Sequence, residues 1–278
     1  MKETLRLPRG HDGDLWHWLR RPEHFLHRHN ELEACLVVRG HAVFIVENRK
    51  YVLKPQSMIW LFPAQEHLLV NQSRDFEMWL LLFGRRLLKK HCASPDSSTL
   101  RRADPKKHFC RTLPRAEAEK LCALYAQLFQ LREQRDLFNA GLGYALLASW
   151  TAQTKEGATE SGKDLHPSVA HAVRLIQNER TPLTLPDICL SAGMSSSRLC
   201  ELFKEQMGVT LIQYRSRQRL QRFFDLYGSG HQRNMLSAAL EAGFGSYPQF
   251  HRVFKALTGT SPAQYRREKK SGGITRSS

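Results

Sequence analysis

The sequence lacks any long apolar run. Its longest strongly apolar stretch, Met78 to Phe83, is far shorter than the roughly 20 residues that a membrane-spanning helix needs. The opening MKETLRLPRG carries charges where a signal peptide has an apolar segment, so we expect a cytoplasmic protein without a membrane partner. Cysteine is sparse, and its six positions never form a CxxC pair. They predict neither a zinc ribbon nor a disulfide framework.

Acidic residues are also few. The chain has 26 Asp and Glu against 42 Lys and Arg, which gives a net charge of +16. This excess indicates an anionic partner such as nucleic acid, although a membrane surface or a merely basic soluble protein would fit it too. With 278 residues, 41% of them apolar, the chain can build a core in each of about two domains. A coiled-coil rod, a collagen-like fibre and a wholly disordered chain are excluded.

The pattern changes along the chain and predicts an α+β protein. Short β-like runs from about Phe25 to Phe83 indicate a small barrel or sandwich. Apolar residues three and four apart from Pro114 to Gln153 indicate a helix pair that covers this domain or forms a dimer face. We assign 1–153 to this first domain, 154–164 to a polar flexible linker, 165–270 to an all-helical domain and 271–278 to a disordered tail.

The helical domain contains a repeat of about 50 residues. Ala192 to Arg215 align with Ala242 to Arg266, with one residue inserted in the second copy. In each copy a short helix, Leu185 to Ala192 or Leu236 to Ala242, ends at an Ala-Gly pair whose glycine allows a tight turn. A serine cap then opens a second helix. This is the pattern of a helix-turn-helix, whose second helix fits the major groove; an ordinary helical hairpin is the alternative.

A basic helix is expected between the two units, from Leu211 to Leu226. If it holds the two second helices about 34 Å apart, both can enter successive major grooves on one face of the duplex. Its arginines are then either phosphate clamps or solvated charges. The candidate phosphate contacts in the domain are Lys204, Arg215, Arg217, Arg219, Arg222, Lys255 and Arg266.

These residues resemble the AraC/XylS transcription regulators, whose DNA-binding domain joins two helix-turn-helix units by a helix. The segment Gly243 to Arg267 is similar to the family signature, and the resemblance covers about Ser168 to Arg267. The loop Gly228 to Asn234 is about one residue longer than usual in the family. The resemblance implies six base-reading residues: Ser197, Cys200 and Glu201 in the first unit, and Tyr247, His251 and Arg252 in the second.

The first domain contains two groups of histidines and polar residues. The run FLHRHNELEACLVVRG has the spacing HxHx3Ex6G, and Px3Hx3N follows at Pro63. On an unbroken strand, His27, His29 and Glu33 would face one side, where their side chains converge. Both groups resemble the two cupin motifs, with Ser57 and Ala64 in place of glycines.

The cupin resemblance implies a candidate divalent transition metal bound by His27, His29, Glu33 and His67, a nitrogen and oxygen set suited to iron, manganese, nickel or zinc. The alternative is that the same four residues, with Trp60 as an apolar wall, line an effector pocket without metal. A third alternative is that the histidines are structural.

Two classes of function follow. The first is a ligand-responsive transcription regulator, not an enzyme. Its expected partners are double-stranded DNA and a small effector such as a sugar, with RNA polymerase and a second copy of the chain implied by the family. The second is a metal-dependent cupin isomerase or dioxygenase with a helical appendage, which leaves the duplicated helix-turn-helix unexplained. A constitutive DNA-binding protein with an inactive pocket is a further alternative.

Overall fold

The computed structural model describes residues 7–19, 27–155, 160–179, 183–228 and 234–270. The chain forms two compact units, Met1–Leu165 and His166–Ser278. The end of the segment that the sequence suggested as a linker is bound to the first unit, where the backbone N–H of Glu160 donates to the carbonyl of Cys110. The tail 271–278 and most of the long loop, 229–233, lie outside the described residues.

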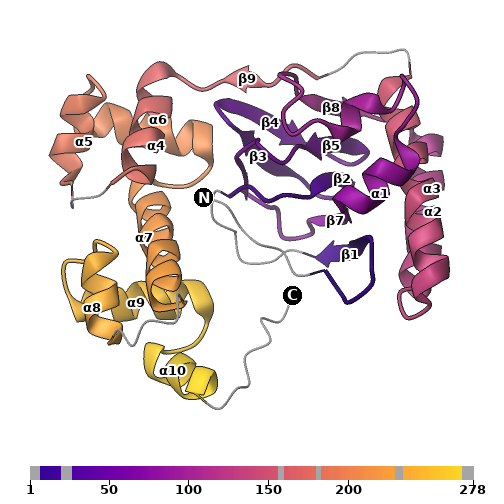
Figure 1. Cartoon of the computed structure of the whole chain (residues 1–278). Coiled ribbons are helices and arrows are strands. Elements are labelled where there is room, and N and C mark those ends of the chain that lie inside the picture. Colours follow the sequence, from indigo (N-terminus) through magenta and orange to yellow (C-terminus); the bar gives the residue numbers. More distant parts are fainter. Residues whose placement is uncertain (1–6, 20–26, 156–159, 180–182, 229–233, 271–278) are drawn as a thin grey trace. The chain divides into compact units, whose positions relative to one another are not determined.

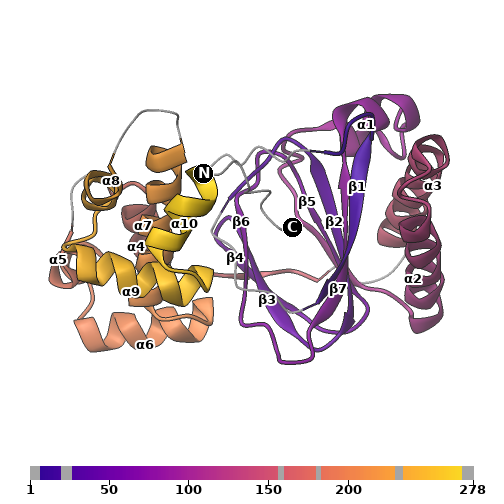
Figure 2. The ribbon, with the colours of Figure 1, turned by 90° about the horizontal axis from the view of Figure 1, so that it is seen from below.

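The first unit contains two antiparallel sheets (Figures 1 and 2). The five-stranded sheet has the order β1 (Gly13–Leu19), β7 (Glu77–Phe83), β2 (Leu32–Arg39), β5 (Ser57–Leu61) and β8 (Phe109–Thr112). The four-stranded sheet has the order β6 (His67–Val70), β3 (Ala42–Val46), β4 (Arg49–Leu53) and β9 (Lys163–Asp164). The β-like runs of the sequence become β2 to β5 and β7.

Strand β7 explains the longest apolar run of the sequence. It pairs with β1 on one side and β2 on the other, and both of its faces are covered. Met78, Leu80 and Leu82 point into the core between the sheets, whereas Trp79 and Leu81 belong to the core on the other face. A strand that is buried on both faces carries apolar residues at successive positions, whereas a half-exposed strand alternates apolar and polar residues.

Helices cover the outer face of the five-stranded sheet (Figure 2). They are α1 (Arg85–His91), the short 3-10 helix η1 (Ser98–Arg101), α2 (Arg115–Gln130) and α3 (Arg135–Thr154). The pair α2 and α3 confirms the helices expected from Pro114 to Gln153. Tyr125 of α2 is fully buried and forms a 2.5 Å hydrogen bond with Ser149 of α3. Of the two roles considered for this pair, the covering of the sheet is confirmed.

The second unit is entirely helical in its described residues. Its elements are α4 (Pro167–Gln177), α5 (Leu185–Ser191), α6 (Ser196–Met207), α7 (Leu211–Gly228), α8 (Met235–Glu241), α9 (Tyr247–Thr258) and α10 (Pro262–Lys270). The fold class is therefore confirmed: a sheet-rich domain with helices precedes an all-helical domain. Within the described residues, every helix is too short or too polar to span a bilayer.

Candidate functional site

The first helix-turn-helix unit consists of α5 and α6. Helix α5 begins with a capping box in which Thr184 and Asp187 each bond the other's backbone N–H. Gly193 lies in the turn with φ +67°, a backbone conformation that favours glycine. The hydroxyl of Ser195 then accepts a hydrogen bond from the N–H of Arg198 and caps α6. The turn and the cap confirm the local signals of the sequence.

The second unit repeats this geometry with α8 and α9. Gly243 has φ +97°, and the hydroxyl of Ser246 accepts from the N–H of Gln249. Both second helices also end at a left-handed glycine, Gly208 after α6 and Gly259 after α9. Each second helix buries one apolar face, carried by Leu199 and its neighbours in α6 and by Phe250 and Phe254 in α9. The repeat in the sequence is therefore a repeat of the same structural unit.

The six predicted base-reading residues lie on the opposite, outward faces of α6 and α9. Ser197, Glu201 and Arg252 are exposed. Cys200 and His251 are half-buried, and 39% of Tyr247 is exposed. On each helix these side chains lie within about two turns, so they form one compact patch per unit. The candidate phosphate contacts Lys204 and Lys255 occupy equivalent exposed positions in the last turns of the two helices, and Arg266 is exposed on α10.

Three of the arginines on α7 have an internal partner instead of a solvent-facing role. Glu179, which follows α4, has a side chain only 1% exposed. Its carboxylate lies 2.5 Å from Arg215, 3.0 Å from Arg219 and 3.7 Å from Arg222. The prediction treated these arginines as phosphate clamps or solvated charges, and the structure instead makes them counter-ions of a buried carboxylate. We therefore leave them out of the candidate DNA interface. Arg217 is half-buried on the same helix.

The electrostatics of this cluster favour ionised Glu179. Burial alone would raise the pKa of its carboxyl, but the hydrogen bonds from Arg215, from the N–H of Leu183 and from Arg219 outweigh burial and lower it. A buried carboxylate with several cationic donors is the arrangement in which a buried charge is tolerated. The cluster joins the segment after α4 to α7, the helix that contacts α6, α8 and α9.

The histidines of the first unit meet at one end of the two sheets. His27 and His29 precede β2, and the backbones of His27 and His67 exchange two hydrogen bonds of 3.1 and 2.9 Å. The strand β2 begins only at Leu32, so the unbroken strand assumed from the spacing is absent. The side chains converge nevertheless: Nε2 of His29 lies 2.9 Å, and Nε2 of His67 lies 3.9 Å, from Oε2 of Glu33.

Burial and the contacts within this group together set its protonation. His29 and His67 are each 2% exposed, and Glu33 is 5% exposed. Burial, together with the neighbouring His27, lowers the pKa of His67 to about 3, so its imidazole is neutral at pH 7. Burial would raise the pKa of Glu33, but the hydrogen bond from His29 and the charges of the nearby histidines lower it to about 2.

Trp60 does not belong to this group, and its expected place in the pocket is wrong. In the register of β2 and β5, Glu33 lies opposite Leu61, whereas Trp60 lies opposite Ala34. Directly paired residues share a face, and successive residues alternate between faces. Trp60 therefore points away from the histidines into the helix-covered core, where its ring lies 5.3 Å from that of Trp150.

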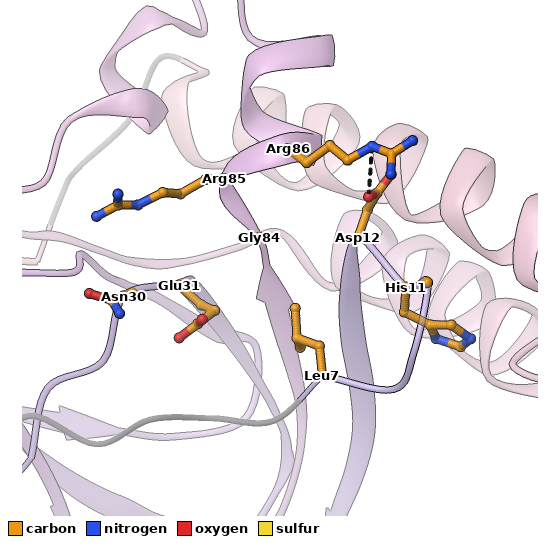
Figure 3. A pocket seen from close by; sticks show the side chains of 9 residues that line it. Leu7, His11, Asp12, Asn30, Glu31, Gly84, Arg85 and Arg86 are labelled. Carbon is orange, nitrogen blue, oxygen red and sulfur yellow. Dashed lines mark ion pairs between the residues drawn. The ribbon is translucent and has the colours of Figure 1, made fainter.

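A pocket of about 420 Å³ lies elsewhere in the first unit (Figure 3). Its lining comes from the segment before β1, the loop before β2 and the start of α1: Leu7, Gly10, His11, Asp12, Asn30, Glu31, Gly84, Arg85 and Arg86. Figure 3 shows Arg86 reaching Asp12, at 3.4 Å, while Arg85 lies across the opening from Asn30 and Glu31. Charges of both signs thus line this cavity, together with apolar surface such as that of Leu7.

Glu31 connects the pocket to the histidine group. Its side chain lines the cavity, and one of its carboxylate oxygens is buried without a hydrogen-bond partner. Its backbone carbonyl lies 3.0 Å from Nδ1 of His29. Glu31 therefore contributes to the pocket and also contacts the histidine group.

Comparison with known proteins identifies both units. Residues 19–147 match the model of the AraC-like ligand binding domain, and residues 188–268 match that of a helix-turn-helix domain. The chain belongs to the AraC-type transcription regulators.

Several known regulators are similar to this AraC-type chain over most of its length. The uncharacterized HTH-type transcriptional regulator YfiF of Bacillus subtilis is 23% identical over 90% of this chain and 81% of its own length. The arabinose operon regulatory protein of Escherichia coli is 23% identical over 83% of this chain and 78% of its own. A solved structure of ToxT from Vibrio cholerae covers 91% of this chain and 96% of its own, with 12% identity and a TM-score of 0.38. The matched families and relatives are regulators, so the enzymatic alternative has no support.

Sequence reasoning missed two features of this regulator. Glu179 belongs to no sequence motif, and only the packing of α4 against α7 brings it close to the arginines of α7. Among the pocket residues, Asp12 directly precedes β1, and Arg85 and Arg86 follow β7; the two strands pair across 58 to 70 positions of the chain. Asn30 and Glu31 were the accessible signals, because both lie between the motif residues His29 and Glu33.

Proposed function

We propose that α6 and α9 read DNA bases in successive major grooves. The observation that carries this proposal is the duplicated unit: two second helices with the same cap, the same terminal glycine and an outward polar face. In this proposal Arg252 pairs with guanine, Glu201 accepts from cytosine, and the other four predicted residues contact neighbouring bases. Lys204, Lys255 and Arg266 contact phosphates, as does Arg217 on the helix α7 that joins the units.

We also propose that the regulator responds to a small polar effector in the pocket shown in Figure 3. The mixed lining, which includes Arg85, Asn30 and the carboxylate of Glu31, offers both donors and acceptors to a ligand rich in hydroxyl groups. A sugar fits this chemistry, and one relative regulates an arabinose operon. For a response, the effector must bind one arrangement of the regulator more tightly than another.

Further partners in this proposal are RNA polymerase and a second copy of the chain, with the regulator acting in the cytoplasm. Exposed apolar side chains on α3, Leu137 and Tyr144, lie on the helix pair that the sequence analysis suggested as a dimer face. Light scattering of the purified chain at several concentrations gives its oligomeric state directly.

Selection from genomic DNA tests the central proposal. The purified full chain is mixed with sheared DNA from its own source at physiological salt, with and without cell extract as a source of effector. We expect enrichment of a few fragments that share a motif, and loss of that enrichment in the double variant E201A/R252A. The variant Lys120→Ala, on an exposed position of α2, serves as a matched control. Absence of any shared motif in both conditions would refute sequence-specific reading.

A further inference from the structure

Positive charge in the first unit is concentrated in one short segment. Residues 85–107 contain eight Lys and Arg but only two acidic residues, Asp96 and Asp104. The other 142 residues of this unit contain 18 basic and 17 acidic residues. The net charge of +7 on the unit therefore comes almost entirely from 23 residues, which form α1, η1 and the loops that follow them.

The cations of α1 lie on the outward face of the helix. Leu87 and Leu88 anchor the helix in the core. An α-helix has 3.6 residues per turn, so the two basic residues before this leucine pair and the two after it lie together on the opposite face. All four are exposed: Arg85, Arg86, Lys89 and Lys90. The exposed face of α1 therefore carries only cations over these two turns.

Helix η1 adds two more cations beside α1. The two helices contact each other, and Arg101 and Arg102 are exposed. Burial raises the pKa of the Cys92 thiol, at the end of α1, to about 11, and the charge of Arg101 acts against this rise. The guanidinium of Arg101 therefore lies near the end of α1. We define the basic patch as Arg85, Lys89, Lys90, Arg101 and Arg102.

Acidic side chains do not compensate the basic patch. Arg86 pairs with Asp12, and Lys106 pairs with Asp104, whereas the five patch residues form no ion pair within the described part of the chain. Like charges four positions apart, which α1 has twice, destabilise a helix. Cations in the first turn also oppose the helix dipole. The stability of the fold therefore does not account for this charge, and an anionic partner would offset the repulsion.

We propose that the basic patch contacts the phosphate backbone of the DNA that the second unit reads. This inference rests on the proposed function. Exposed Lys and Arg without acidic partners neutralise phosphates and release counter-ions. In the second unit, Glu179 occupies three arginines of α7, which leaves few cations there for phosphates. The basic patch supplies further cations from the first unit, and it strengthens binding without reading the sequence.

Salt-dependent affinity of the full chain tests the proposal. The DNA is the fragment obtained by genomic selection, with long flanks on both sides of its motif. Arg85 is left unchanged because it also lines the pocket (Figure 3). The patch variant changes the other four cations: K89Q/K90Q/R101Q/R102Q.

We expect the patch variant to bind at least about threefold more weakly at physiological salt. The slope of log affinity against log salt concentration should become less steep by about 0.9 for each phosphate contact that is lost. Base preference within the motif should not change, because phosphate contacts carry no sequence information. Hydroxyl-radical footprinting should show protection of the backbone outside the motif in the unmodified chain and less of it in the patch variant.

A control variant removes the same charge from other exposed positions of the first unit: R39Q/K54Q/R74Q/K120Q. Both variants lower the net charge of the chain equally. The affinity and the salt slope of the control variant should therefore stay close to those of the unmodified chain. Circular dichroism shows whether each variant folds, and R101Q/R102Q replaces the patch variant if the latter does not.

Equal affinity and equal salt slope in the patch and control variants would overturn the proposal, while an enriched motif would still support base reading. Absence of a shared motif with the unmodified chain would instead refute base reading, on which the inference rests. Vesicles of anionic phospholipid test the other anionic surface. If the patch variant lost vesicle binding and kept its DNA affinity, the basic patch would be a membrane contact and the proposal would be wrong.

Discussion

Arg219 donates a hydrogen bond of 3.0 Å to Glu179, which connects α7 to the segment after α4 in the middle of the DNA-binding unit. Arg215 and Arg222 complete the cluster around the same carboxylate. Because α7 contacts both helix-turn-helix units, this buried ion cluster helps to fix the element that joins them.

Replacement of Glu179 with Gln should destabilise the second unit. Three arginines then lose their common carboxylate, and removal of one partner of a buried ion pair costs about 3–5 kcal/mol. Urea unfolding followed by far-UV circular dichroism measures this loss. All five tryptophans lie in the first unit, so their fluorescence reports that unit separately and should be unchanged. Glu205→Gln, at an exposed glutamate of α6, is the control, and an equal loss from it would contradict the role of Glu179.

The same carboxylate predicts a pH dependence. The pKa of Glu179 is lower in the folded chain than its ordinary value of 4.5. Its contribution to stability is therefore present above pH 4.5 and is lost as the pH falls through the folded pKa. The free energy of unfolding of the second unit, measured from pH 7 to acidic pH, should fall in the unmodified chain and fall less in Glu179→Gln. Identical pH profiles for the two chains would refute the role of Glu179 in this pH dependence.

The turn glycines should differ in their tolerance of alanine. Gly193 and Gly243 both have positive φ, where a Cβ costs roughly 1–2 kcal/mol. A Cβ at Gly243 would also come within 3.2 Å of Arg219, whereas at Gly193 nothing lies within 4 Å. We expect Gly243→Ala to lose more stability than Gly193→Ala in urea unfolding. Gly245→Ala, at a glycine whose φ is not positive, should be close to neutral. A larger loss at Gly193 would contradict the contact with Arg219.

The helix-turn-helix units were predictable because their signals are local. A serine cap, an Ala-Gly turn and an apolar spacing of three and four define each unit within about 25 residues, and the structure confirms them at Ser195, Gly193 and their counterparts. Strand β1 was missed, since only its first half is buried and its partner β7 is about 60 residues away in the chain.

The sites that depend on register or packing were less predictable. The cupin resemblance grouped His29 and His67 with Glu33, and the three side chains do lie together in the structure. The exclusion of Trp60 from this group follows from the register between β2 and β5, which no local pattern specifies. The arginines of α7 look like phosphate contacts in the sequence for a similar reason. Only the folded chain shows that Glu179 lies among them.

Single substitutions on α9 should separate base reading from phosphate contact. Arg252→Ala should relax base preference at one position of the bound motif, because one bidentate contact to guanine contributes about 1–3 kcal/mol of discrimination. Lys255→Ala, one turn further along the same exposed face, should weaken binding to all DNA sequences by the same factor. It should also reduce the salt dependence of the affinity. Affinity for the selected fragment and its single-base variants at several salt concentrations measures both effects. Equal, sequence-independent losses would remove Arg252 from the base-reading set.

The thiol of Cys200 should report entry of α6 into the groove. Burial raises the pKa of Cys122 to about 11 and that of Cys110 to about 12, and it also raises the pKa of Cys200, whose thiol is only partly buried. Reaction with a thiol reagent, mapped by mass spectrometry, should therefore modify Cys200 early, since reactivity follows access and thiolate fraction. The selected DNA fragment should slow modification of Cys200 several-fold and leave Cys122 of α2, in the other unit, unchanged. A base-reading side chain in a major groove is covered by the bases that it contacts. If Cys200 reacted as fast with saturating specific DNA as without DNA, α6 would therefore not be the helix that enters the groove.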